Sequence, residues 1–140
     1  MRRSAIVAAL AVALPGLAAG SDYDWPVVRV IDGDTVQVDA SADMPPELAS
    51  LAVRLRGVDT PETRRPECEA ERRAGNAATA FTKASLVKAG SVLVRDPAWG
   101  KYGSRVIANL VLDGETLSAM LIDAGHGRPY SGGKRRGWCD

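Results

Sequence analysis

Alternating apolar and polar residues predict three strands in the first half of the chain. Residues 35–39 (Thr-Val-Gln-Val-Asp) alternate cleanly, and 27–31 are rich in valine and isoleucine. The intervening Asp-Gly-Asp at 32–34 is a tight turn, so these two strands form a hairpin. Within 51–58, apolar residues alternate with two arginines and predict the third strand.

The second half combines helical and extended patterns. Residues 69–89 are rich in Ala, Glu, Arg and Lys, place small and apolar residues at helical spacing, and are followed by Gly90 as a stop. Strands are predicted over 92–94 and 105–112, with a loop containing glycine and proline between them. A second helix is predicted over 116–124, ended by the next glycine.

The order of these elements decides the fold class. Three strands, a helix, two strands and a helix do not alternate as β-α-β units. The pattern alone supports an α+β fold, mainly β with helices, or a β-barrel. Among these we favour a five-stranded OB-fold barrel, with one helix between strands three and four and a second after strand five.

Residues 1–20 have the layout of a secretory signal peptide, with two arginines near the start, an apolar run over 5–14 and small residues after it. The run is shorter than the roughly 20 apolar residues of a spanning helix, and Pro15 interrupts it. We expect an exported protein, periplasmic or secreted, with one domain over 21–140 and no stable membrane association after cleavage. An uncleaved segment that tethers it to the inner membrane is the alternative.

Charge is distributed unevenly along the chain. Removing residues 1–20 takes two arginines and no acids from the 18 basic and 17 acidic residues, which leaves a net charge of −1. Residues 21–63 carry nine acids and three arginines, whereas 64–140 carry thirteen bases and eight acids. The acidic half favours a hard cation and the basic half a polyanion. Two solvated surfaces of opposite sign are the alternative.

Cys68 and Cys139 are the two cysteines, and a disulfide between them is the default expectation for an exported chain. Closing a loop of about 70 residues is worth roughly 4 kcal/mol in the chain-entropy model. The chain has one histidine, His126, and no Cys-x-x-Cys pair, which argues against zinc sites and His-based nucleophilic triads.

Four acidic residues beside predicted turns are candidate metal ligands: Asp32, Asp34, Asp59 and Glu62. Hard cations such as Ca²⁺ take several carboxylate and carbonyl oxygens that lie close together. The hairpin turn and the end of the third strand meet if the three strands are neighbours. Asp and Gly are also what any tight turn prefers, so local sequence alone favours turn chemistry.

Arg54 and Arg105 lie at the edges of predicted strands and are candidate phosphate ligands. Phosphoryl transfer needs positioning and positive charge aimed at the phosphate oxygens. A guanidinium group is permanently charged and can bind two oxygens at once. Glu62 is a candidate general base toward water. Ordinary solvent-facing arginines on strands are the alternative.

Four short motifs change the balance between these alternatives: IDGDT at 31–35, RLRGVDTPET at 54–63, AFTK at 80–83 and KYGSR at 101–105. In this order and spacing they resemble the staphylococcal nuclease (thermonuclease) family, and the resemblance covers about 27–125. The first motif alone is a weak signal; followed at this distance by the second, it is a strong one.

The resemblance implies an OB-fold barrel that cleaves DNA and RNA phosphodiesters with Ca²⁺, without selectivity for the sugar, and leaves 3′-phosphate products. The partner is then a nucleic acid, with single strands favoured, and we expect a monomer. By position, the resemblance assigns Asp34 and Asp59 as carboxylate ligands of Ca²⁺, Thr60 as a carbonyl ligand, Asp32 as an outer-shell acid, Glu62 as the residue that activates or orients water, Arg54 and Arg105 as phosphate-binding arginines, and Lys101 and Tyr102 as contacts to a terminal phosphate.

The chain departs from the family pattern in three ways. Ser104 is inserted before the arginine, although counting back from the following turn still places Arg105 at the expected strand position. A basic tail over 128–139 replaces the family's long C-terminal helix. The near-neutral charge predicts weaker nucleic-acid affinity. Within the tail, Tyr130 is either a base-stacking residue or part of the packing under Cys139.

Two other classes of function remain open. A noncatalytic OB-fold module that binds single strands or a protein partner would be free to lose Glu62 or an arginine, and this chain has kept them. A structural domain stabilised by calcium is the third possibility. The sequence does not distinguish DNA from RNA as the preferred substrate.

Overall fold

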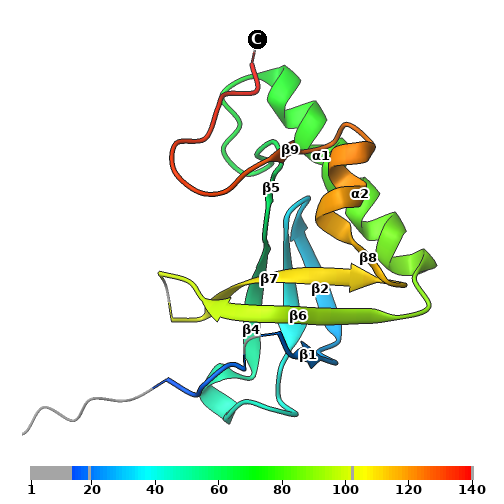
Figure 1. Cartoon of the computed structure of the whole chain (residues 1–140). Helices are drawn as coiled ribbons and strands as arrows, with labels where there is room; N and C mark the ends of the chain where they lie inside the picture. The colour runs from blue at the N-terminus through cyan, green and yellow to red at the C-terminus, as the bar shows by residue number, and fades with distance from the viewer. Residues whose placement is uncertain (1–13, 19, 102, 140) are drawn as a thin grey trace, which may run out of the picture.

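A computed structural model describes residues 14–18, 20–101 and 103–139. A mixed sheet forms the body of the molecule, and two helices pack together at one end of it (Figure 1). The elements are β1 (Asp22–Tyr23), β2 (Val27–Asp32), β3 (Thr35–Asp39), the 3-10 turn η1 (Pro46–Leu48), β4 (Ser50–Leu55), β5 (Val58–Asp59), α1 (Glu69–Lys88), β6 (Val92–Trp99), β7 (Arg105–Leu112), β8 (Glu115–Thr116), α2 (Leu117–Asp123) and β9 (Arg128–Pro129).

The strand order is OB-like, and the predicted class, mainly β with helices, is confirmed. Strands β2, β3 and β4 form an antiparallel meander, β4 pairs in parallel with β7, and β6 pairs antiparallel with β7. The main sheet follows the path β1-β6-β7-β4-β3-β2. Among the described strands the sheet is not closed into a barrel, and β1 and β2 are the two ends of this path.

Two predicted strand boundaries were wrong. The strand predicted over 51–58 ends at Leu55, because Gly57 adopts a φ of 84° and turns the chain. Val58–Asp59 becomes the separate strand β5, which pairs with β9 of the tail. The strand predicted over 92–94 continues to Trp99 through an irregularity at Asp96, whose φ is 53°.

The core follows the alternation that predicted the strands. Val53 and Leu55 of β4 are buried, whereas Arg54 between them is partly exposed. The same alternation buries two valines of β3, and Leu117 and Leu121 of α2 close the core at the helical end. Burying such a side chain contributes about 1.5–3 kcal/mol. This core fixes β4 and β7, the strands that carry Arg54 and Arg105.

Helix α1 begins one residue after Cys68 and ends one residue before the predicted boundary, with Ala89 as its cap. Its buried face consists largely of small residues, which brings the helix close to two loops. A Cβ atom at Gly75 would lie 2.7 Å from the carbonyl oxygen of Glu62, so glycine permits this approach. Thr82 donates a hydrogen bond to the carbonyl of Gly33, at 2.7 Å. The helix therefore fixes both loops against each other.

The second helix is shorter than the predicted 116–124. Thr116 is its N-cap, and its side chain accepts a hydrogen bond from the backbone N–H of Ala119. Ala124 is the C-cap, and the following Gly125 has a φ of 78°, as the predicted stop requires.

Most of the predicted signal peptide lies outside the described residues. Of its described part, Pro15 accepts a hydrogen bond from the indole N–H of Trp99, at 3.0 Å. Within the described part of the chain, no helix combines the length and the apolar character that crossing a membrane requires. Export and cleavage stay predictions.

Candidate functional site

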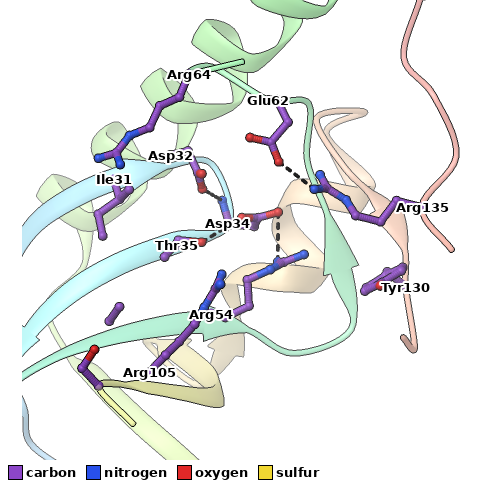
Figure 2. A pocket seen from close by; sticks show the side chains of 12 residues that line it. Ile31, Asp32, Asp34, Thr35, Arg54, Glu62, Arg64, Arg105, Tyr130 and Arg135 are labelled. Carbon is purple, nitrogen blue, oxygen red and sulfur yellow. Dashed lines mark hydrogen bonds and ion pairs between the residues drawn. The ribbon is translucent and has the colours of Figure 1, made fainter. Parts of the chain in front are cut away.

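A cleft of about 570 Å³ lies beside the β2–β3 turn, where β4, the start of β7 and the C-terminal tail also meet (Figure 2). Acidic and basic side chains face each other across it. Its lining residues are Ile31, Asp32, Asp34, Thr35, Ala52, Arg54, Glu62, Arg64, Ser104, Arg105, Tyr130 and Arg135.

Asp34 connects the hairpin turn to the loop after β5. Its carboxylate accepts hydrogen bonds from the backbone N–H of Thr60 and from the hydroxyl of Thr35, both at 3.0 Å. Asp34 is buried, and a buried carboxylate needs such partners because it has lost its water. The predicted meeting of the hairpin turn with the end of the third strand is therefore observed.

The side chain of Arg54 on β4 points toward Asp34 (Figure 2). Its guanidinium is 2.9 Å from Asp34 and 3.5 Å from Asp59. It also donates to the carbonyl oxygen of Val58, at 2.9 Å. These contacts fix the guanidinium plane at the cleft wall, so Arg54 is positioned before any ligand arrives.

Asp59 and Thr60 are buried and do not line the cleft, but they contact its lining residues Arg54 and Arg135. The short strand β5 carries Asp59 to these contacts because the turn at Gly57 redirects the chain after β4. Glu62 follows after Pro61, and its backbone N–H donates to the buried carboxylate of Glu71 on helix α1, at 3.4 Å. The side chain of Glu62 is half-buried at the cleft edge.

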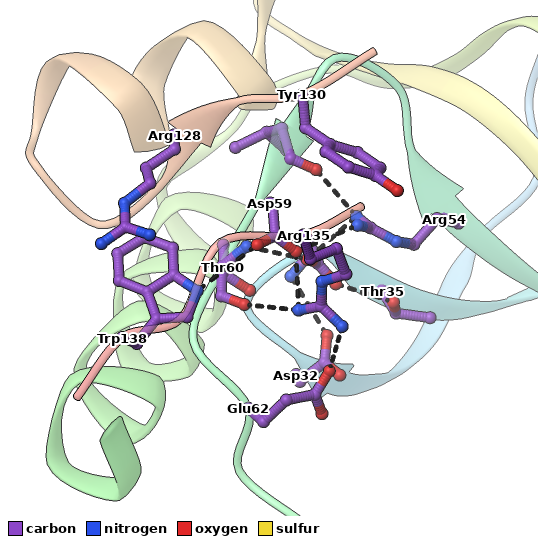
Figure 3. Close-up of polar contacts among 12 residues, drawn as sticks. Asp32, Thr35, Arg54, Asp59, Thr60, Glu62, Arg128, Tyr130, Arg135 and Trp138 are labelled. Atoms are coloured by element: carbon purple, nitrogen blue, oxygen red, sulfur yellow. Dashed lines mark hydrogen bonds and ion pairs between the residues drawn. The ribbon is translucent and has the colours of Figure 1, made fainter. Parts of the chain in front are cut away.

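Arg135, which belongs to none of the sequence motifs, contacts three of the predicted site residues (Figure 3). The guanidinium of Arg135 is 2.6 Å from the carboxylates of Asp59 and of Glu62. It also donates to the carbonyl oxygen of Thr60, at 3.2 Å. Burial alone would lower the pKa of Arg135, but its hydrogen bonds to Glu62 and then Asp59 raise this pKa above the usual value.

The predicted disulfide explains how the tail reaches the site. Cys68 and Cys139 are bonded, with Cα atoms 5.9 Å apart. Glu62 stands six positions before Cys68, and Arg135 stands four positions before Cys139. These two spacings, taken with the predicted disulfide, were the signal in the sequence that could have placed Arg135 near Glu62.

Trp138 and Arg128 fix the tail further. The indole N–H of Trp138 donates to Asp59, at 3.3 Å, and the guanidinium of Arg128 lies 3.6 Å from the centre of the Trp138 ring (Figure 3). Such cation–π contacts contribute about 0.5–2 kcal/mol. The tail is therefore an ordered wall of the site along this stretch.

Asp32 lies beside Asp34 in the turn, and its carboxylate accepts the backbone N–H of Asp34, at 3.2 Å. Burial, and next the negative charge of Asp34, raise the pKa of Asp32 to about 7. The crowding of acidic groups at this turn therefore favours the presence of a positive charge.

The remaining predicted residues, Arg105, Lys101 and Tyr102, differ in whether the structure places them at the cleft. Arg105 begins β7 and lines the cleft together with Ser104, so the inserted serine does not remove the arginine from the site. Arg105 forms no ion pair within the described part of the chain. Lys101 is exposed in the β6–β7 loop and does not line the cleft. Tyr102 lies outside the described residues.

The oxygen atoms of Asp34 and of its neighbours Asp59 and Thr60 are of the kind that fits a hard cation. Asp34 and Asp59 offer carboxylate oxygens and Thr60 a carbonyl oxygen, the donor type that Ca²⁺ takes. Guanidinium groups already contact all three residues. Arg54 pairs with Asp34, and Arg135 pairs with Asp59 and donates to the carbonyl oxygen of Thr60. The oxygens therefore converge on positive charge.

The OB-like fold and the cleft define a domain that can hold a cation and a phosphate together. A profile described as "Staphylococcal nuclease homologue" matches residues 52–136. Two curated proteins are similar: a "Thermonuclease" of Staphylococcus hyicus, 32% identical over 113 residues, and a "Thermonuclease" of Staphylococcus intermedius, 38% identical over 104 residues. The chain belongs to the staphylococcal nuclease family, as its motifs predict.

The two similarities differ in coverage. That to the Staphylococcus hyicus protein covers 81% of this chain and 63% of the relative. That to the Staphylococcus intermedius protein covers 73% of this chain and 56% of the relative. The chain thus spans less than two thirds of the length of either relative.

Proposed function

We propose that this protein is a calcium-dependent, sugar-nonspecific endonuclease that hydrolyses DNA and RNA phosphodiesters to 3′-phosphate products. One observation carries the proposal: a single cleft is lined by the arginines Arg54 and Arg105, by Glu62 and by Asp34, and Arg54 also contacts the buried carboxylate of Asp59. The two "Thermonuclease" relatives support the same reaction class.

Arg54 and Arg105 bind the scissile phosphate. They project from neighbouring strands, since β4 and β7 pair in parallel with Ala52 opposite Arg105. Two guanidinium groups on rigid strands stabilise the charge on the phosphate oxygens in the transition state and lose little motion when they do so. Arg54 then shares its donors between the phosphate and Asp34.

Glu62 activates water. A water molecule attacks phosphorus in line and transfers a proton to the Glu62 carboxylate, while the bond from phosphorus to the 5′ oxygen breaks. The leaving oxygen takes a proton from solvent, and the products are a 3′-phosphate and a 5′-hydroxyl. The backbone of Glu62 is fixed against helix α1 by Glu71 and by the close approach at Gly75, which positions the base.

Asp34, Asp59 and the Thr60 carbonyl would hold Ca²⁺, with Asp32 outside this set. When bound, the metal supplies Lewis acidity and positive charge toward a phosphate oxygen. The position of Asp32 supports its outer place, because it accepts the backbone N–H of Asp34 in the same turn and lines the same cleft.

The cleft mouth supports a single-stranded substrate. Beside Arg54, a hollow of about 450 Å³ is lined by Leu55, Ile107 and Tyr130, among others. An apolar surface with an aromatic ring is suited to an unpaired base. This favours the stacking role for Tyr130, whose ring centre is 6.0 Å from the Arg54 guanidinium.

We further propose that the protein acts outside the cytoplasm, periplasmic or secreted, as a monomer without stable membrane association. The disulfide of the structure suits an oxidising compartment. Fractionation of cells that express the full chain, with mass spectrometry of its N-terminus, tests export and cleavage. A full-length protein in the membrane fraction would favour the tethered alternative.

A nuclease assay tests the proposal. The chain should degrade plasmid DNA and RNA with Ca²⁺, lose this activity in excess chelator, and yield oligonucleotides that carry a 3′-phosphate. Full activity in chelator would contradict the calcium requirement. If the protein binds single strands without cutting them under either condition, it is a noncatalytic binding module.

A further inference from the structure

The C-terminal tail places a positive charge on the proposed metal ligands. We propose that Arg135 is a tethered internal cation that competes with Ca²⁺ for this site, so that metal can bind only when the guanidinium moves away. The inference rests on the calcium site proposed above. It assigns to the tail a function in setting the metal affinity.

The contacts of Arg135 carry the inference. One nitrogen, Nη2, is 2.6 Å from Oδ1 of Asp59 and 3.2 Å from the carbonyl oxygen of Thr60. These are two of the three proposed calcium ligands. A metal ion bonded to the same two oxygens would need the volume that Nη2 fills, and two adjacent cations would repel. Guanidinium and metal therefore exclude each other here.

The second nitrogen, Nη1, is 2.6 Å from Oε1 of Glu62. While this ion pair exists, the proposed base shares its charge with Arg135 rather than with water. Movement of the guanidinium would therefore free a metal ligand and the base together. Both side chains are 38% exposed, so solvent screens this ion pair, whereas Asp59, the other carboxylate that Arg135 contacts, is buried.

The covalent tether sets the strength of this competition. Only three residues separate Arg135 from Cys139, which is bonded to Cys68. These four links span at most roughly 14 Å when fully extended. On the other side, β9 pairs with β5, which itself carries Asp59. The guanidinium thus stays at high effective concentration beside its carboxylates without diffusing away.

Neighbouring tail residues supply a matched comparison. Arg136 carries the same charge one position later, and it forms no ion pair with the described residues. Removing the charge at 136 changes the overall field of the tail but leaves the Asp59 oxygens covered. Removing it at 135 uncovers them.

The test is calorimetric titration of Ca²⁺ into the oxidised, metal-free full chain. Arg135→Gln should bind Ca²⁺ about tenfold more tightly than the wild type, within the usual range of couplings between sites. Arg136→Gln should change the affinity by less than about twofold. Circular dichroism and melting curves of each variant check that the fold is kept.

A second variant tests the tether without touching Arg135. The double substitution Cys68→Ser with Cys139→Ser releases the tail end, so its Ca²⁺ affinity should also rise, by several-fold. Adding Arg135→Gln to this double variant should then raise the affinity much less than it does in the wild type. This non-additivity is specific to a tethered competitor.

The outcomes are distinguishable. If Arg135→Gln binds Ca²⁺ with unchanged or weaker affinity, the competition is refuted, while a wild type that binds calcium and cuts DNA keeps the proposed function. Equal gains for Arg135→Gln and Arg136→Gln would also refute it, because general charge would then explain both. If no variant binds Ca²⁺, the metal site and the competition fall together.

Discussion

The guanidinium of Arg54 lies 2.9 Å from the carboxylate of Asp34, and both side chains are largely buried. The pair joins the proposed phosphate ligand to a proposed metal ligand. Removing one partner of such a pair leaves an uncompensated charge, whereas the intact pair adds little net stability. Arg54 is thus a structural counter-ion in the metal-free protein as well as a proposed catalytic group.

Arg54→Met should therefore destabilise the metal-free protein by about 3 kcal/mol. Saturating Ca²⁺ should reduce the difference from the wild type, because the metal supplies the positive charge that Asp34 has lost. Urea denaturation in chelator and in Ca²⁺ measures both effects. Arg29→Met, on the exposed face of β2, is the control and should change stability little. An equal loss for Arg54→Met under both conditions would contradict this account.

Glu62→Gln should lower kcat by about 10²–10⁴-fold and leave KM nearly unchanged, because it removes a proton acceptor and keeps the shape of the side chain. Steady-state cleavage of an oligonucleotide measures both constants. Glu67→Gln removes an exposed acid five positions away and should leave kcat unaltered. A change confined to KM would show that Glu62 binds substrate rather than activating water.

Asp32→Asn should make the stability of the metal-free protein less dependent on pH. The pKa of Asp32 is about 7 in the folded chain, against about 3.9 unfolded. The folded state therefore binds more protons between these values, and the wild type loses stability as pH rises from about 4 to 7. Asparagine does not titrate, so the variant keeps its stability over this range. Its free energy of unfolding relative to that of the wild type should therefore grow with pH, by more than about 1 kcal/mol at pH 8.

Melting curves in chelator from pH 4 to pH 8 test the titration of Asp32. The asparagine oxygen can still accept the N–H of Asp34, so the turn itself should remain. A difference between variant and wild type that stays constant over this pH range would exclude Asp32 as the titrating group.

Gly75→Ala should move the loop that carries Glu62. The new methyl would lie 2.7 Å from the Glu62 carbonyl and 2.9 Å from that of Pro61, so the helix or the loop must shift. Overpacking of this kind costs about 1–3 kcal/mol, more than the gain in helix propensity from glycine to alanine. Asn76→Ala, on the exposed face of α1, is the control. Stability and kcat should both fall for Gly75→Ala, and neither should fall for Asn76→Ala.

The sequence predicted those parts of the fold that local pattern determines. Alternation around Val53 placed β4, and helical spacing with the Gly90 stop placed α1 to within one residue. It did not predict that Gly57 would separate β5 from β4, since Val58 continues the alternation. The pairing of β5 with β9 depends on the path of the distant tail, which no local pattern encodes.

The candidate site divides in the same way. Asp34, Arg54 and Glu62 could be predicted because they occur in motifs with family spacing, and they do line one cleft. Arg135 belongs to no such motif, and the signal for it was indirect: its spacing from Cys139, taken together with that of Glu62 from Cys68. Its position follows from a crosslink to Cys68, far along the chain.

Cys68 has a second contact beyond its bond to Cys139. Its sulfur accepts the backbone N–H of Glu71 at the start of α1, at 3.4 Å, and the carboxylate of Glu71 accepts the backbone N–H of Glu62. The Cys68 sulfur thus forms the disulfide, caps helix α1 and is connected to the proposed base Glu62 through the hydrogen bonds of Glu71. Breaking the crosslink in a reducing compartment should therefore release the end of the tail that carries Arg135 and leave the hydrogen bonds that join Cys68, Glu71 and Glu62 in place.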